Sequence, residues 1–286
     1  MKKGISTIIA ILIILALTLG AALLVQKYTK IDDMSGPDIN YTSPEDKQSS
    51  DQEEEKKEEE PEEKVKTPKD KVAIILDDLG NNFKTDKSLS GINQNITLAI
   101  LPNREATLSS ARYLSNFNNF QLILHLPLEP IDPKDTEEDM VMTDMNKEEI
   151  EIEVNDYLKE IGQYVVGANN HKGSKFTSNR NQMKNLLEVL KKKDLFFVDS
   201  FTYKDSIAYQ VAKELNVKTA RRDVFLDNSS NKEDIKARLD ETVELAKANG
   251  TAIAIGHSRP STISVLKEEM KKYKNVEFVK VSNLLE

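Results

Sequence analysis

The chain has 286 residues, a formal net charge of −8 and no cysteine. The lack of cysteine excludes disulfides, thiolate metal sites and a lipidated-cysteine anchor, and it leaves the redox compartment open. Residues 1–44 carry a net charge of +1, and Glu45–Asp70, with 12 acidic and 6 basic side chains, carry −6, so Lys71–Glu286 carries a net charge of only −3. A mildly acidic globular part without a basic stripe argues against nucleic acid as a partner.

Residues 1–25 predict a membrane anchor or a signal segment. Gly4–Val25 is a stretch of 22 residues without a charged side chain, and Lys2 and Lys3 precede it. This stretch is long enough to span a bilayer as a helix, and it is longer than the usual core of a cleaved signal peptide. We therefore expect an anchor in the cell membrane, with the remaining chain outside the cytoplasm. Cleavage after the small residues 20–22, which would give a secreted protein, stays open.

Residues 26–70 predict a disordered acidic linker. They include the run Q-E-E-E-K-K-E-E-E-P-E-E-K and few apolar residues. Such a segment cannot bury enough surface to offset its chain entropy, and its like charges repel. We expect a solvated tether between the anchor and the folded part, residues 71–286.

From Lys71 onward, short apolar runs alternate with amphipathic segments. The expected strands are Val72–Leu76, Ile96–Ile100, Gln121–Leu124, Tyr164–Ala168, Leu195–Val198, Val217–Ala220, Thr251–Ile255 and Val276–Lys280. The expected helices lie near Lys84–Leu89, Glu105–Leu114, Lys147–Ile161, Arg180–Lys192, Ser206–Leu215, Asn231–Ala248 and Ser261–Tyr273. This alternation predicts an α/β fold with a parallel sheet, and seven or eight units favour a closed or nearly closed barrel over a doubly wound open sheet.

The first strand ends in two carboxylates, in the sequence V-A-I-I-L-D-D-L-G. Asp77 and Asp78 repel each other and lose hydration at the end of a buried strand. A divalent cation bound by one of them is a common reason to keep such a pair, with the other free to act as a base. A solvated turn is the alternative, because Asp, Asn and Gly cluster in turns.

Polar residues also follow the later strands, where a barrel of this kind carries its chemistry. The chain has only three histidines, and each comes directly after a predicted strand. These polar residues are His125 and Glu129, then Asn169, Asn170 and His171, then Asp199, then Arg221, Arg222 and Asp223, and finally His257. Three of three histidines beside an Asp pair predict a shared metal and acid–base site. The long segment between Pro127 and Asn146 is expected to fold over it.

Six motifs resemble those of the divergent polysaccharide deacetylase family, a branch of the NodB-like carbohydrate esterases. They are V-A-I-I-L-D-D-L-G, L-H-L-P-L-E-P, N-N-H-K-G-S-K-F-T, F-F-V-D-S, R-D-V-F-L-D-N and A-I-A-I-G-H, and they span most of Lys71–Glu286 in order. The resemblance implies a distorted (β/α)7–8 barrel. It also implies zinc-dependent (or other divalent-metal-dependent) removal of N-acetyl or O-acetyl groups from a polysaccharide, such as one of the cell envelope.

The resemblance assigns roles to four residues. Asp77 matches the catalytic base and Asp78 the metal-binding aspartate. His125 matches the first metal histidine, and His257 is similar to the histidine that acts as general acid.

One position departs from the wider pattern. The usual second metal histidine lies four residues after the first, and Glu129 stands there in this chain. We expect His171, from the neighbouring strand end, to take its place, so that Asp78, His125 and His171 hold the metal with one position open. Glu129 is the alternative third ligand; its other role would be to fix the long loop.

Four more residues are candidates for supporting roles. Asp199 or Asp223 could orient His257 and raise its pKa, and Arg222 could offset the surplus carboxylates. A structural ion-pair network is the alternative for all three. Asn170, with Arg222, is a candidate for substrate binding, and a loop-capping role is its alternative.

The departure at Glu129 also leaves a second function open, a catalytically weak module that binds envelope glycans or proteins. Hydrolysis of a phosphoester is a third possibility, which the lack of a basic cluster beyond Arg221 and Arg222 disfavours.

Overall fold

The computed structural model describes residues 70–286. The predicted membrane segment, and the predicted linker except for Asp70, lie outside the described residues and stay predictions. Within residues 70–286, no helix is both long and apolar enough to cross a membrane.

Strands and helices alternate along the described chain. The strands are β1 (Asp70–Leu79), β2 (Ile96–Ile100), β3 (Phe120–Leu128), β4 (Val165–Lys172), β5 (Phe196–Asp199), β6 (Thr219–Arg221), β7 (Val224–Phe225), β8 (Thr251–His257) and β9 (Val276–Val279). The helices are α2 (Phe83–Ser88), α3 (Thr107–Leu114), α4 (Lys147–Ile161), α5 (Arg180–Lys192), α6 (Ala208–Glu214), α7 (Lys232–Asn249) and α8 (Pro260–Glu269).

All eight predicted strands and all seven predicted helices are present, with two differences. The two-residue strand β7 was not predicted, because its apolar run is too short to stand out. The second difference is that β1, β3, β4 and β8 continue past the predicted ends. The polar residues expected in loops after these strands are therefore held in strand ends by the ladder of the sheet.

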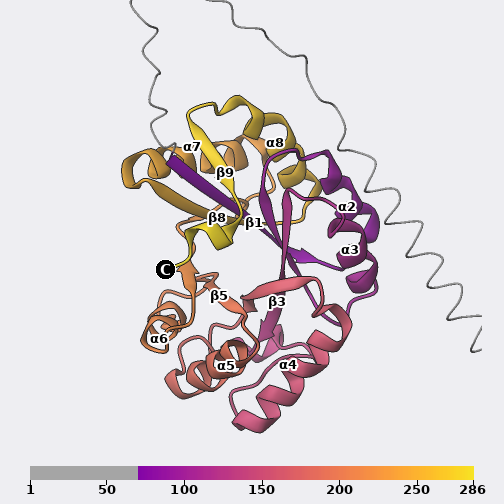
Figure 1. Cartoon of the computed structure of the whole chain (residues 1–286), viewed down its shortest axis with the longest axis vertical. Coiled ribbons are helices and arrows are strands. Elements are labelled where there is room, and N and C mark those ends of the chain that lie inside the picture. The colour runs from indigo at the N-terminus through magenta and orange to yellow at the C-terminus, as the bar shows by residue number, and fades with distance from the viewer. Residues whose placement is uncertain (1–69) are drawn as a thin grey trace, which may run out of the picture. The chain divides into compact units, whose positions relative to one another are not determined.

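The sheet is parallel and strongly curled (Figure 1). Its order is β6-β5-β4-β3-β2-β1-β8-β7, with β9 beside the start of β1. Only Arg222 and Asp223 separate the two edge strands β6 and β7. The Arg222 N–H donates to the Asp199 carbonyl of β5, and the Asp223 N–H donates to the Ile253 carbonyl of β8. One stretch of chain thus contacts both edges of the sheet, which fits a curled barrel and contradicts the doubly wound alternative.

The curled sheet separates two apolar layers. One layer joins strand residues with residues of the surrounding helices, and the other consists mainly of strand residues enclosed by the sheet. Along β1, Val72 and Ile74 belong to the outer layer, whereas Ala73 and Ile75 belong to the inner layer. Because side chains alternate along a strand, the inner series continues at Asp77.

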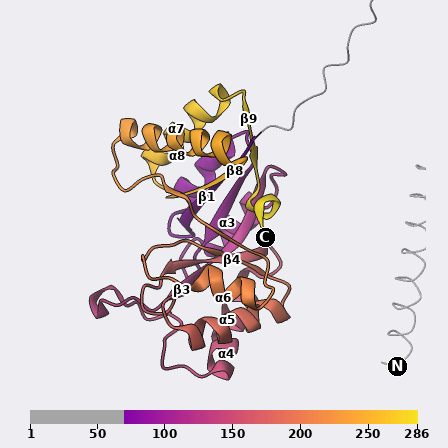
Figure 2. The ribbon, with the colours of Figure 1, turned by 90° about the vertical axis from the view of Figure 1, so that its left-hand side faces the viewer.

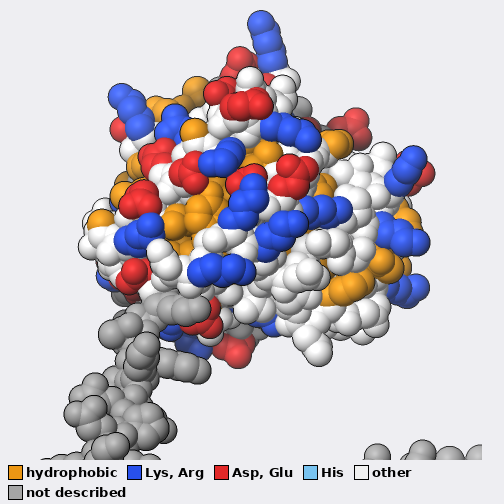
Figure 3. All heavy atoms as spheres, turned by 90° about the horizontal axis from the view of Figure 1, so that it is seen from above, with side chains coloured by type: hydrophobic (Ala, Val, Ile, Leu, Met, Phe, Trp, Pro, Cys, Tyr) orange, Lys and Arg blue, Asp and Glu red, His pale blue; other side chains and the backbone are white. Residues whose placement is uncertain are grey.

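Helices cover the outside of the sheet. In Figure 2, α7 and α8 lie on one side of the strands, and α4, α5 and α6 lie on the opposite side. On the α7–α8 side, basic and acidic side chains are interspersed (Figure 3), in part through pairs along α7 such as Lys236–Asp240 and Arg238–Glu241. Opposite charges on this face therefore lie close enough to pair along the helix.

The packing of β4 against β5 can be tested at Gly167. A Cβ atom at this position would lie 2.4 Å from the ring of Phe196, its register partner in β5. We expect Gly167→Ala to lower the free energy of unfolding by about 1–3 kcal/mol, the usual cost of overpacking a core. Urea denaturation measures this change. The double variant Gly167→Ala/Phe196→Leu should recover part of the loss, and a loss unaffected by the second change would contradict this packing.

Candidate metal centre and acid–base pair

The end of β1 places both aspartates on the same side of the sheet. In a regular strand, Asp77 and Asp78 would point to opposite faces. Here the pairing of β1 with β2 shifts register between Leu76 and Leu79, and Asp78 has a left-handed backbone with φ of 63°. This irregular turn is costly for a residue other than glycine, and such strain is typical of functional sites.

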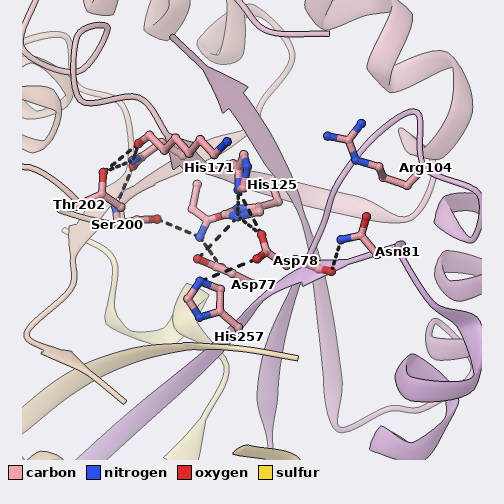
Figure 4. Close-up of polar contacts among 12 residues, drawn as sticks. Asp77, Asp78, Asn81, Arg104, His125, His171, Ser200, Thr202 and His257 are labelled. Atoms are coloured by element: carbon pink, nitrogen blue, oxygen red, sulfur yellow. Dashed lines mark hydrogen bonds and ion pairs between the residues drawn. The ribbon is translucent and has the colours of Figure 1, made fainter. Parts of the chain in front are cut away.

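Three side chains from three strands converge at this turn (Figure 4). Asp78 Oδ1 lies 3.2 Å from His125 Nε2 and 3.1 Å from His171 Nδ1. The two histidine nitrogens lie 3.2 Å from each other. The three atoms form a nearly equilateral triangle. A tetrahedral zinc site with bonds of about 2.0–2.1 Å separates its ligand atoms by about 3.3 Å, so the triangle has the size that such a site requires.

A hydrogen-bond chain fixes the ring of His125. Asn169 Nδ2 donates to Asp77 Oδ1 over 2.8 Å, so the amide oxygen of Asn169 must face His125. That oxygen lies 2.8 Å from His125 Nδ1, which therefore carries a proton and donates it. In the neutral ring, the lone pair of Nε2 then faces Asp78 and His171.

The ring of His171 is oriented in the same sense. Its Nε2 lies 3.3 Å from Glu137 Oε1, which can only accept, so the lone pair of Nδ1 faces the triangle. Asp78 Oδ1 is the one buried side-chain polar atom of the described residues that lacks a hydrogen-bond donor. With both rings neutral, three electron-pair donors thus face one another, which fits a divalent cation.

Charges around the triangle shift the pKa values of its members. Burial alone would raise the pKa of Asp78, but His125 and His171 hold it far below its usual range. Burial lowers the pKa of His125, and Asp77 followed by Asp78 outweighs this and raises the pKa to about 9. A proton and a metal ion therefore compete for His125 Nε2.

Asp77 lies beside the triangle without belonging to it. It is only 5% exposed, and its Oδ2 is 3.8 Å from His125 Nε2. Burial is the main cause that raises the pKa of Asp77; His125 and the hydrogen bond from Asn169 act in the opposite direction. An acid in such surroundings is suited to accept a proton during a reaction.

His257 lies beside Asp77, its register partner in the pairing of β1 with β8. Its Nε2 is 3.8 Å from Asp78 Oδ2, and its Nδ1 is 2.9 Å from Asp227 Oδ1. Burial lowers the pKa of His257, but the hydrogen bond and charge of Asp227 outweigh it and raise the pKa. The reciprocal effect of His257 lowers the pKa of Asp227, against its desolvation.

The carboxylate that orients His257 is therefore Asp227, and not Asp199 or Asp223 as expected from the sequence. Asp199 lies on the helix-facing side of β5, where it accepts from Ser206 Oγ and from the N–H of Phe201 and that of Tyr209. Asp223 accepts from the N–H of Ile253 in β8. Both carboxylates fix backbone through hydrogen bonds, a structural role that differs from the predicted ion-pair network.

The other predicted site residues are also engaged in local structure. Glu129 accepts from the N–H and hydroxyl of Thr143 and from Lys175, so it fixes the long loop and is not part of the triangle. Arg222 donates to the carbonyls of Ser200 and Phe201.

Asn170 is likewise a structural link rather than a free donor. Its amide oxygen accepts from the Ser200 N–H, and its amide nitrogen donates to the Lys172 carbonyl. It therefore ties the end of β4 to the segment after β5, as the loop-capping alternative holds.

Comparison with known proteins identifies the family. A family model described as divergent polysaccharide deacetylase matches residues 74–285. The chain belongs to this family. The YibQ protein of Escherichia coli is 33% identical over 215 residues, which make up 75% of this chain and 67% of that protein. A protein of Haemophilus influenzae is 32% identical over 215 residues, which make up 74% of this chain and 76% of that protein.

A solved structure shows the same fold. The crystal structure of protein ATU2773 from Agrobacterium tumefaciens C58 matches with a TM-score of 0.70 at 19% identity. The match covers 77% of this chain and 90% of that one. The curled parallel sheet is thus a fold that this chain shares with a solved protein.

The triangle makes a direct prediction about metal binding. We expect His171→Ala to lower the zinc content of the purified protein severalfold, because one of three ligands is lost. His257→Ala should leave the zinc content unchanged, because His257 lies outside the triangle. Elemental analysis after dialysis measures both, and wild-type stoichiometry in His171→Ala would exclude this residue as a ligand.

The His257–Asp227 pair predicts a pH dependence of stability. Because folding raises the pKa of His257, the protonated side chain stabilises the folded state below about pH 6.5, the pKa of an unfolded histidine. This contribution is lost as the pH rises through the higher pKa that His257 has in the folded state. The lowered pKa of Asp227 contributes above about pH 3.9 and is lost at more acidic pH. In metal-free protein, Asp227→Asn should therefore cost more stability at pH 5.5 than at pH 9.5.

Thermal or urea unfolding at the two pH values measures this difference. In the background of His257→Gln, the same Asp227→Asn change should cost equal stability at both pH values. An equal cost at both pH values in the wild-type background would mean that the ion pair does not form.

Proposed function

We propose that this protein is a metal-dependent deacetylase that removes acetyl groups from a polysaccharide. The observation that carries this proposal is the arrangement around Asp78: a triangle of metal-ligand atoms lies beside a buried acid, Asp77, and near a histidine paired with a carboxylate, His257. Hydrolysis of an acetamide needs these elements together, because one group must take a proton from water and another must give one to the departing amine.

The residues that would hold the cation are Asp78, His125 and His171. A divalent ion such as Zn²⁺ bound by them would polarise the acetyl carbonyl and make water more acidic. The outer partners of both histidines, Asn169 and Glu137, support this assignment, because ligating histidines usually donate their second N–H to such groups.

Asp77 is the proposed general base. Its Oδ1 accepts from Asn169, whereas its Oδ2 lies 3.8 Å from His125 Nε2, beyond hydrogen-bond distance. This leaves Oδ2, beside the triangle, to accept the proton of an attacking water. The raised pKa brings the basicity of Asp77 closer to the operating pH than that of an exposed aspartate.

His257 is the proposed general acid. Asp227 holds Nδ1–H, which leaves Nε2 directed toward Asp78 and the site. The raised pKa of His257 favours the protonated form, so Nε2–H can be donated to the sugar amine as the bond to the acetyl carbon breaks.

The acetyl group can be bound to nitrogen or to oxygen of the sugar, and the family description supports a polysaccharide as the substrate class. A cell-envelope polysaccharide fits best with the predicted membrane segment Gly4–Val25, which would hold the folded part outside the cytoplasm.

The role of Asp77 can be separated from metal binding. We expect Asp77→Asn to lower kcat for acetate release from N-acetylated glycan oligomers by at least about 10²-fold, because the base is lost. The same variant should keep its zinc content, whereas Asp78→Asn should lose zinc and activity together. Acetate release and elemental analysis on the two variants give the comparison.

Undiminished acetate release by Asp77→Asn would remove Asp77 as the base. If the zinc-loaded wild-type protein binds glycan but releases no acetate, the module that binds envelope glycans without strong catalysis becomes the better account.

A further inference from the structure

The long loop between β3 and α4 is fixed against the end of β3. Val141 forms a bridge with Leu128 and exchanges backbone hydrogen bonds with Pro127 and Glu129. Tyr157 of α4 donates its hydroxyl to the carbonyl of Asp139. These contacts hold the second half of the loop beside the strand that carries His125.

Glu137, in the middle of this loop, contacts the candidate metal centre. Its Oε1 lies 3.3 Å from His171 Nε2 and accepts from Lys172 Nζ over 2.8 Å. Its Oε2 pairs with Arg104 of the segment after β2. Lys172 also donates to the Asp135 carbonyl over 2.7 Å. One half-buried carboxylate thus joins the loop to two segments: the segment after β2, and the end of β4, which carries a metal-ligand histidine.

The contact with Glu137 determines how His171 meets the other ligands. An imidazole can present either nitrogen, and the partner of one nitrogen fixes the proton position for the whole ring. Because Glu137 accepts from Nε2, the proton stays there and Nδ1 offers its lone pair toward Asp78. Among the described residues, Glu137 is the one hydrogen-bond acceptor for this nitrogen, so its loss would leave the ring free to rotate or to change tautomer.

We propose that Glu137 is a positioning residue for His171 and that it couples the Pro130–Asn146 loop to metal binding. This inference rests on the proposed metal centre and adds a residue and a loop to it. If Glu137 supports the metal-bound orientation of His171, metal binding strengthens the contact in return, because coupling between two equilibria is reciprocal. The loop is then better ordered when metal is bound.

A loop-fixing ion pair without influence on the metal is the competing explanation, and the neighbours of Glu137 distinguish the two. Arg104→Ala removes one anchor of the loop but leaves the contact between Glu137 and His171. Glu137→Ala removes both, and Glu137→Gln retains an acceptor oxygen without the charge. Glu138, the next residue, is exposed and its side chain forms no hydrogen bond or ion pair with the described residues, so Glu138→Ala is a matched control.

The first measurement is the zinc dissociation constant of the full chain by competition with a chelator. We expect Glu137→Ala to weaken zinc binding about 10–100-fold, the usual effect of removing an outer partner of a metal ligand. Glu137→Gln should restore part of the affinity, Arg104→Ala should have a smaller effect than Glu137→Ala, and Glu138→Ala should bind as wild type. Wild-type affinity in Glu137→Ala, or equal losses in Arg104→Ala and Glu137→Ala, would overturn the positioning role.

The second measurement is hydrogen exchange in residues 130–146 with and without zinc. Zinc should slow exchange of this loop in the wild type and in Glu138→Ala but not in Glu137→Ala. No response to zinc in the wild type would overturn the coupling. A wild-type protein that does not bind zinc would overturn the metal centre and this inference together, whereas normal zinc binding in Glu137→Ala would overturn this inference alone.

Discussion

The left-handed backbone at Asp78 is the constraint on which the site depends. A regular strand end would leave one of the two aspartates facing the helices, and only the other could face the mouth of the barrel. The register shift after Leu76 and the positive φ of Asp78 bring both carboxylates to one side. One then joins two histidines, and the other stays free beside them. The chemical division between Asp77 and Asp78 is therefore a consequence of one irregular turn.

The remaining site residues are placed by the regular part of the sheet. Ile123 belongs to the inner apolar layer, so His125, two residues later, lies on the same side. The pairing of β3 with β4 places Asn169 beside His125, and the pairing of β1 with β8 places His257 beside Asp77. Parallel neighbours end at the same edge of the sheet, so residues far apart in the chain meet there without long loops to carry them.

Much of this could be predicted from the sequence, because buried strands and amphipathic helices leave clear patterns. The Asp pair and the three histidines stood at strand ends, and the structure brings them together. Asp227 was missed as the partner of His257, because it follows β7, whose two residues give no periodic signal. The sequence contained no indication of Glu137 either, because a long loop places it beside His171. The path of such a loop depends on tertiary contacts such as the bridge formed by Val141.

Glu129 is the opposite case: the sequence suggested a site residue, and the structure places it outside the triangle. Its spacing from His125 suggested a metal ligand, but the strand continues to Leu128 and the loop turns back, so the carboxylate meets Thr143 and Lys175. Spacing along a chain predicts convergence only where the backbone between the residues is regular. Strand β4, which pairs with β3, has such a regular backbone, and its residue His171 occupies the third corner of the triangle.

The most direct test of the central claim is anomalous diffraction at the zinc absorption edge, from crystals of the protein grown with zinc. The account predicts one strong peak within bonding distance, about 2.0–2.2 Å, of Asp78 Oδ1, His125 Nε2 and His171 Nδ1, with Asp77 unligated beside it. A peak elsewhere, or none at these three atoms in zinc-saturated crystals, would contradict it.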